Sequence, residues 1–133
     1  MTFGKKRKAM GSKSKDNCYE LLRFSSSGNI PGIGNKLFKY FKDHYKPIEV
    51  ISYCDLRWGI GTLYKQMGFA LDHISPPNYW YMKDYTTREY RFKYRKDVLV
   101  KEGNTKNNTE WRIMCDLGYD RIWDCGNQVW IWK

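Results

Sequence analysis

Apolar side chains are grouped along this chain in short runs separated by polar, turn-forming segments. Residues 18–24 and 48–53 are rich in aromatic and β-branched side chains, which predicts two strands. Between them, four apolar residues recur at helical spacing: Leu37, Phe38, Phe41 and Tyr45. They predict a helix over 35–45, with Asn35 as its N-cap. A strand, a helix and a strand in this order predict a right-handed βαβ unit with parallel strands.

The pattern continues beyond the βαβ unit. Residues 51–69 are typical of a buried strand, a polar turn and a short helix that ends at Gly68. Further strands are predicted over residues 69–74, 78–82 and 90–100. Residues 109–118 are typical of a short helix, with Thr109 as its N-cap and Gly118 at its end.

The chain is predicted to end in a β-hairpin. Residues 121–125 and 128–132 flank the dipeptide Gly126-Asn127, which suits a two-residue turn. In that register, Trp123 pairs with Trp130 and Ile122 with Ile131.

These elements predict the α+β class: a mixed sheet with a central βαβ unit, two to three helices and the terminal hairpin. Residues 1–16 have many lysines and few apolar side chains, so we expect a basic flexible lead. Residues 17–133 are then expected to form a single domain, since 133 residues suffice for one modest core.

Charge and composition favour a polyanionic partner. The formal net charge is +10, the isoelectric point is near 9.5, and aromatic residues make up 17% of the chain. Lysine and arginine suit phosphates, and aromatic rings suit stacked bases. No apolar run approaches the roughly 20 residues that cross a bilayer. With no signal-peptide pattern and no C-x-x-C pair among four cysteines, we expect a cytoplasmic protein with free, mostly buried thiols and no metal.

Three sets of side chains are candidates for contact with DNA. The first is the basic lead, with Lys5, Lys6, Arg7 and Lys8. The second follows the strand 48–53, where Arg57 could bind a phosphate and Trp58 could stack on a base. The third is the strand expected over 90–100, where alternate residues share a face and would align Arg91, Lys93 and Arg95. For the second set, the alternative is a turn formed by Asp55 and Arg57 with Trp58 as a lid. For the third, it is an ordinary solvated sheet face.

Two motifs resemble known families. The run Leu63-Tyr64-x-x-Met67-Gly68-Phe69 resembles the L-Y-x-K-x-G-F signature of the GNAT acyltransferase superfamily. The preceding turn, with Asp55, Arg57, Trp58 and Gly61, is similar to the GNAT-like C-terminal region of phage-encoded homing endonucleases of the very-short-patch-repair type, and to the phage Mom DNA-modification protein. The resemblance implies a GNAT-like fold, a phage or mobile-element origin, and DNA as the target.

The GNAT resemblance also implies a coenzyme A site. In that family the loop before the central helix binds the pyrophosphate, which corresponds here to Gly32, Ile33, Gly34 and Asn35. The family tyrosine that protonates the departing thiolate corresponds to Tyr64, and Asp55 could act as a base or position an amine. Asn29 and Pro31 depart from the family pattern. An ordinary strand-to-helix turn and a packed Tyr64 are the alternatives.

The favoured function is therefore a DNA-binding, GNAT-like module related to mobile-element endonucleases, acting in the cytoplasm of a phage-infected bacterial host. No nuclease pattern is recognisable, and relatives carry a nuclease domain and further strands upstream of the region matched. No cofactor is expected. One alternative is a Mom-like transferase that uses acetyl-CoA or another acyl-CoA to modify DNA or another acceptor. The other is a phage factor that binds an acidic host protein.

Overall fold

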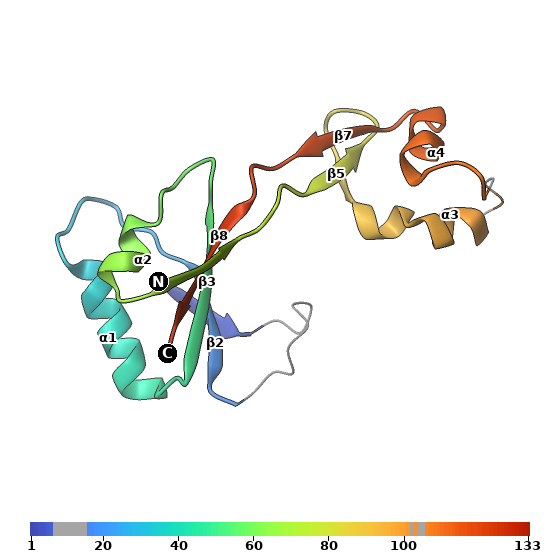
Figure 1. Ribbon diagram of the computed structural model, residues 1–133. Coiled ribbons are helices and arrows are strands. Elements are labelled where there is room, and N and C mark those ends of the chain that lie inside the picture. The colour runs from blue at the N-terminus through green and yellow to red at the C-terminus, as the bar shows by residue number, and fades with distance from the viewer. Residues whose placement is uncertain (7–15, 102, 104–105) are drawn as a thin grey trace. The chain divides into compact units, whose positions relative to one another are not determined.

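The computed structural model describes residues 1–6, 16–101, 103 and 106–133 (Figure 1). The chain is of the α+β class, as expected. It does not form the single domain expected over 17–133, because it divides into two compact units. Unit 1 comprises residues 1–76 and 126–133, and unit 2 comprises residues 77–125.

Unit 1 is built on a mixed five-stranded sheet with the order β1-β2-β3-β8-β4. Its strands are β1 (Thr2–Lys5), β2 (Cys18–Arg23), β3 (Glu49–Asp55), β4 (Ala70–Ile74) and β8 (Asn127–Trp132). Strands β2 and β3 are parallel, and the other neighbouring pairs are antiparallel. The predicted strand–helix–strand order with parallel strands is confirmed, with helix α1 (Ile33–Tyr45) between β2 and β3.

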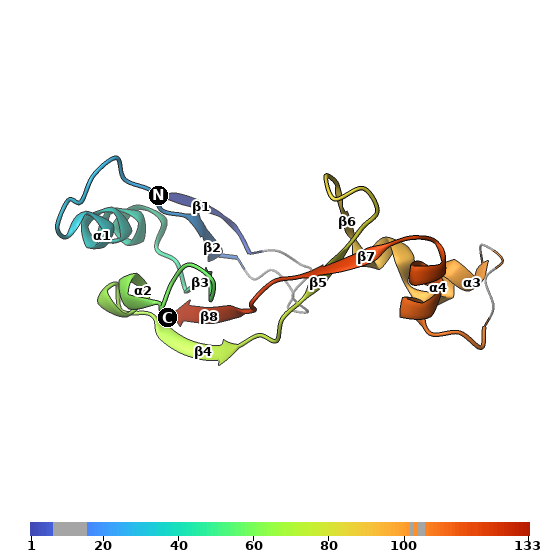
Figure 2. The same ribbon diagram turned by 90° about the horizontal axis from the view of Figure 1, so that it is seen from above.

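Helix α1 and the short helix α2 (Thr62–Gln66) lie on the same face of this sheet (Figures 1 and 2). Their apolar side chains and those of the sheet enclose one core, made of Leu21, Phe38, Phe41, Val50, Met67, Phe69 and Trp130. The helical spacing therefore predicted Phe38 and Phe41 correctly as core residues, whereas Leu37 and Tyr45 are exposed.

Unit 2 contains a three-stranded antiparallel sheet with the order β6-β5-β7. Its strands are β5 (Tyr79–Met82), β6 (Arg88–Tyr90) and β7 (Asp120–Trp123), and its helices are η2 (Arg91–Tyr94), α3 (Lys96–Lys101) and α4 (Glu110–Asp116). As predicted, Thr109 caps α4, its hydroxyl oxygen accepting a hydrogen bond from the Arg112 amide. The core residues are Tyr79, Tyr81, Leu99, Ile113 and Met114.

The predicted terminal hairpin is wrong. Strands β7 and β8 belong to different sheets, so Trp123 pairs with Tyr79, and Trp130 pairs with Ser52 and Leu71. The physical reason is burial: the indole of Trp130 is almost fully enclosed in the core of unit 1, where a hairpin partner on β7 could not also lie. Gly126 has a positive φ of 79°, but it marks the passage between units and not a two-residue turn.

Residues 1–16 are not a wholly unpaired lead. Strand β1 pairs with β2, and the ring of Phe3 stacks on that of Phe41 with a centroid distance of 3.6 Å. This single aromatic side chain gives the basic segment an apolar anchor, which its composition had obscured. Residues 7–15 lie outside the described part of the chain.

Two local predictions also fail. Helix α1 begins at Ile33, so its N-cap is Gly32 in a left-handed conformation (φ 73°), and Asn35 lies inside the first turn. Residues 90–100 form the tail of β6 followed by η2 and α3 instead of one strand. The helical turn of η2 allows the Tyr94 hydroxyl to reach back to the Glu89 carboxylate at 2.5 Å.

Candidate nucleic-acid interface

The loop between β3 and α2 is an ordered turn organised by Asp55. The Asp55 carboxylate accepts a hydrogen bond from the Arg57 amide at 2.8 Å. Its backbone carbonyl accepts two more, from the amides of Trp58 and Gly59, each at 3.0 Å. Asp55 therefore caps the turn with its side chain, which is the role that the sequence offered as the ordinary alternative to a catalytic base.

Two glycines allow this loop to pass close to the rest of unit 1. A Cβ atom added at Gly59 would lie 2.7 Å from the Cys54 thiol, and one added at Gly61 would lie 2.3 Å from the Trp130 ring. Gly61 also has a φ of 81°, which side chains of L-residues rarely allow. The loop is thus fixed by close backbone approach as well as by hydrogen bonds.

The side chains at the tip of this loop point away from the core. Trp58 is 83% exposed and Ile60 is 80% exposed, with Arg57 exposed beside them. The loop, Cys54 and the first residues of α2, including Leu63 and Tyr64, line a groove of about 480 Å³. The structure therefore brings together Arg57, Trp58 and Tyr64, three residues that the sequence singled out.

Tyr64 lies half-buried beside this groove and is tied to β3. Its hydroxyl donates to the Tyr53 carbonyl at 3.2 Å and accepts from the Ser52 hydroxyl at 3.1 Å. Its ring stacks on Trp130 with a centroid distance of 5.7 Å. Burial raises the pKa of Tyr64, partly opposed by the Ser52 hydrogen bond, so the phenol stays protonated at neutral pH.

A second pocket, of about 360 Å³, lies at the N-terminus of α1. It is lined by Gly32, Ile33, Gly34 and Asn35, the residues that the resemblance implied for coenzyme A, and by the preceding loop from Gly28. No side chain caps this helix end, although the Ile33 amide donates to the Ile30 carbonyl at 3.3 Å. The N-terminus of α1 carries the partial positive charge that favours anions. Leu63 borders both pockets, so α2 separates the coenzyme A candidates from Trp58.

The candidate phosphate ligands of the lead have different environments. Lys5 is exposed on β1. Lys6 is engaged within unit 1, because its ammonium lies 2.6 Å from the Glu49 carboxylate. Arg7 and Lys8 lie outside the described residues.

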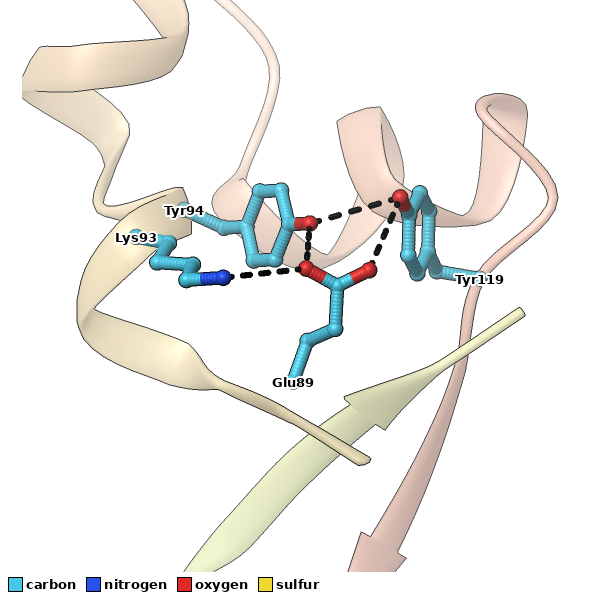
Figure 3. A network of polar contacts seen from close by, with 4 residues as sticks. All are labelled: Glu89, Lys93, Tyr94 and Tyr119. Atoms are coloured by element: carbon cyan, nitrogen blue, oxygen red, sulfur yellow. Dashed lines mark hydrogen bonds and ion pairs between the residues drawn. The ribbon is translucent and has the colours of Figure 1, made fainter. Parts of the chain in front are cut away.

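The three basic residues expected on one strand face lie instead around η2 in unit 2. Lys93 forms an ion pair with Glu89 at 3.6 Å, and Glu89 also accepts hydrogen bonds from Tyr94 and Tyr119 (Figure 3). The guanidinium of Arg91 lies over the Tyr79 ring at 4.5 Å, and that of Arg95 over Phe92 at 4.0 Å. The predicted row of cations is therefore absent from this part of the described chain.

Sequence reasoning missed a polar cluster in unit 2. The Glu110 carboxylate accepts hydrogen bonds from the hydroxyls of Tyr79 and Tyr81 at 2.9 and 2.7 Å. The guanidinium of Arg121 lies 4.3 Å from the centroids of both Tyr79 and Trp111 and donates to the Tyr81 hydroxyl at 3.1 Å. These residues are spread over β5, α4 and β7, so no local pattern connects them.

The cysteines are free among the described residues, and Cys115 and Cys125 are exposed, contrary to the expectation of mostly buried thiols. No three His, Cys, Asp or Glu side chains within that part of the chain are grouped so that they could share a metal ion. None of its helices combines the length and apolar character that a membrane crossing requires. No protein-family model matches this chain, and no curated protein or solved structure is significantly similar to it.

Proposed function

We propose that this chain binds DNA through unit 1, with the loop between β3 and α2 at the centre of the contact. The observation that carries the proposal is an ordered turn that exposes Trp58 next to Arg57 at the carboxyl end of a parallel strand. Exposed aromatic and guanidinium groups side by side suit a base and its phosphate.

The distribution of charge supports the same unit. Unit 1 contains 14 of the 24 lysines and arginines but only 6 of the 14 acidic residues, which leaves most of the net positive charge there. Unit 2, by contrast, is close to neutral, and Lys93 and Arg112 lie in ion pairs with neighbouring carboxylates. A polyanion is therefore expected to associate with unit 1 first.

The test is a titration of a short labelled duplex between about 50 and 200 mM salt, in which the logarithm of affinity should fall linearly with the logarithm of salt concentration. Arg57→Gln should weaken binding and lower the slope by about one, as expected for one lost phosphate contact. Arg112→Gln removes a positive charge from unit 2 instead, and it should leave the affinity and the salt slope unchanged. Absence of binding at low salt, or equal losses in the two variants, would reject the proposal.

A second function, transfer of an acyl group from coenzyme A, is favoured by one observation. A pocket lies at the N-terminus of α1, which no side chain caps, and the GNAT resemblance implies a pyrophosphate at this loop. Tyr64, the residue that the resemblance implies as the acid, is protonated but already hydrogen-bonded to β3. For this reason acyl transfer takes second place.

Thermal melting with acetyl-CoA separates the two functions. A ligand at one hundred times its Kd stabilises the folded state by about 2.7 kcal/mol. Asn35→Glu would place a carboxylate in the first turn of α1, which suits the helix but repels a pyrophosphate. Stabilisation that is present in the parent protein and lost in Asn35→Glu would support the transferase. We expect no stabilisation in either protein.

A further inference from the structure

Trp58 and Ile60 are two large apolar side chains held in water on a single loop. Both are at least 80% exposed, and Leu56, two residues earlier, is 37% exposed. Scattered apolar residues on a surface are ordinary, but an apolar group that gathers on one short segment marks a contact site.

The loop holds these side chains in place before any partner binds. Its amides are bonded to Asp55, and the Leu56 amide also bonds to the Gly126 carbonyl at 3.2 Å. The close approaches at Gly59 and Gly61 leave little room for the loop to fold back over the core. A partner would therefore meet a preformed surface and would not have to order the loop on binding.

The adjoining groove suits a flat aromatic ligand. Its volume of about 480 Å³ lies within the range of small-molecule sites, and Trp58, Ile60 and Leu63 provide apolar lining. The Tyr64 hydroxyl on this lining is already bonded to Ser52 and Tyr53. Stacking and apolar contact would thus dominate over hydrogen bonding, which makes the site tolerant of the identity of the ligand.

We propose that the Trp58–Ile60 loop binds an unpaired nucleobase, which stacks on Trp58 while Arg57 contacts a neighbouring phosphate. This inference rests on the proposed DNA-binding function and names its substrate class: single-stranded DNA, or a duplex with an unstacked base. The positive charge of unit 1 is complementary to this partner. A paired base lies inside the duplex stack, so its faces are not available to the indole.

The experiment compares three labelled DNAs of one sequence: a single strand, a perfect duplex, and the duplex with one bulged base. The full chain should bind the single strand and the bulged duplex more tightly than the perfect duplex. Trp58→Ala should weaken binding to those two DNAs by about 5- to 150-fold, the range found when a stacked base loses its aromatic partner. Its affinity for the perfect duplex should change less than about twofold. Ile60→Ala should shift the preference in the same direction by a smaller factor.

Trp123→Ala is the matched control, because Trp123 is a half-exposed indole in unit 2, and it should leave the preference intact. If duplex and bulged DNA bind equally and Trp58→Ala changes neither, the inference fails while salt-dependent DNA binding stands. If no DNA binds at low salt, both proposals fail. If Trp58→Ala instead abolishes binding to anionic vesicles, or formation of a dimer, and leaves binding to unpaired DNA unchanged, either result would also overturn the inference.

Discussion

The two units enclose aromatic rings in different chemical ways. In unit 1 the rings of Phe38, Phe41 and Phe69 pack with aliphatic side chains and with the indole of Trp130. In unit 2 the buried rings of Tyr79 and Tyr81 carry hydroxyls, and both hydroxyls donate to the carboxylate of Glu110. One core therefore depends mainly on area removed from water, and the other also depends on directed hydrogen bonds.

This difference follows from what each segment can bury. In unit 1, helices α1 and α2 lie over one face of a five-stranded sheet, so many apolar side chains meet there. Unit 2 spans only residues 77–125, with a three-stranded sheet and short helices, and fewer apolar residues can be enclosed. Hydrogen bonds to charged groups then contribute a larger share of its stability, and its fold becomes sensitive to single polar atoms.

The largest effect is expected from Trp130→Ala, which removes a fully buried indole from unit 1. Truncating a large core aromatic costs about 3–5 kcal/mol, and here the loop at Gly61 would also lose its support. Urea unfolding gives the free energy, and hydrogen exchange shows which segments lose protection. Trp123→Ala, a half-exposed indole, should cost much less. Equal losses of unfolding free energy in the two variants would contradict the difference in burial between Trp130 and Trp123.

A smaller loss is expected from Gly61→Ala, about 2–4 kcal/mol, because it combines backbone strain with an overpacked contact against Trp130. Gly32→Ala provides the comparison, since its φ is also positive but no atom lies within 4 Å of the added Cβ. It should cost only the backbone strain, about 1–2 kcal/mol. If both variants unfold at the same urea concentration, the close approach at Gly61 contributes nothing measurable.

The same contrast explains which elements could be predicted from the sequence. In unit 1 the helical spacing of Phe38 and Phe41 predicted α1, and the apolar run at Val50 predicted β3, because side chains that face a hydrophobic core recur at regular intervals in the sequence. In unit 2 the segment from Tyr90 onwards alternates between basic and aromatic residues, which is typical of a strand. The bond from Tyr94 back to Glu89 favours a helical turn instead, and such a bond leaves no periodic signal.

The candidate site, like the fold, was predicted only in part. Arg57 and Trp58 were identified because they follow a strand end, and Tyr64 was identified through the GNAT resemblance. All three line one groove. Ile60 was missed, since exposure of an isoleucine cannot be inferred from its identity. The terminal hairpin failed because pairing between distant strands is decided by which core encloses Trp130, and a local turn signal at Gly126 carries no information about that.

The polar core of unit 2 is tested by Glu110→Ala, which removes the acceptor of two tyrosine hydroxyls. Hydrogen bonds to a charged group are each worth about 1.5–3 kcal/mol, and we expect a total loss in that range because both hydroxyls share one oxygen, Oε1 of Glu110. Asp116→Ala removes an exposed carboxylate of the same helix, paired with Arg112, and should cost less than about 1 kcal/mol. Chemical denaturation that ranks the variants in the opposite order would contradict the described network.

The smallest expected effect is a pH dependence that separates the hydroxyl-rich core from the apolar one. Burial raises the pKa of Tyr81 above its usual value near 10, the hydrogen bond from Arg121 opposes this, and Glu110 adds to the increase. The folded chain then keeps a proton that the unfolded chain begins to lose near pH 10, so the contribution is complete below that pH and declines above it. At pH 10 the loss for Tyr81 is RT ln 2, about 0.4 kcal/mol. Free energies of unfolding between pH 8 and pH 10 should therefore fall less steeply in Tyr81→Phe than in the parent, and parallel profiles would show that this hydroxyl ionises alike in both states.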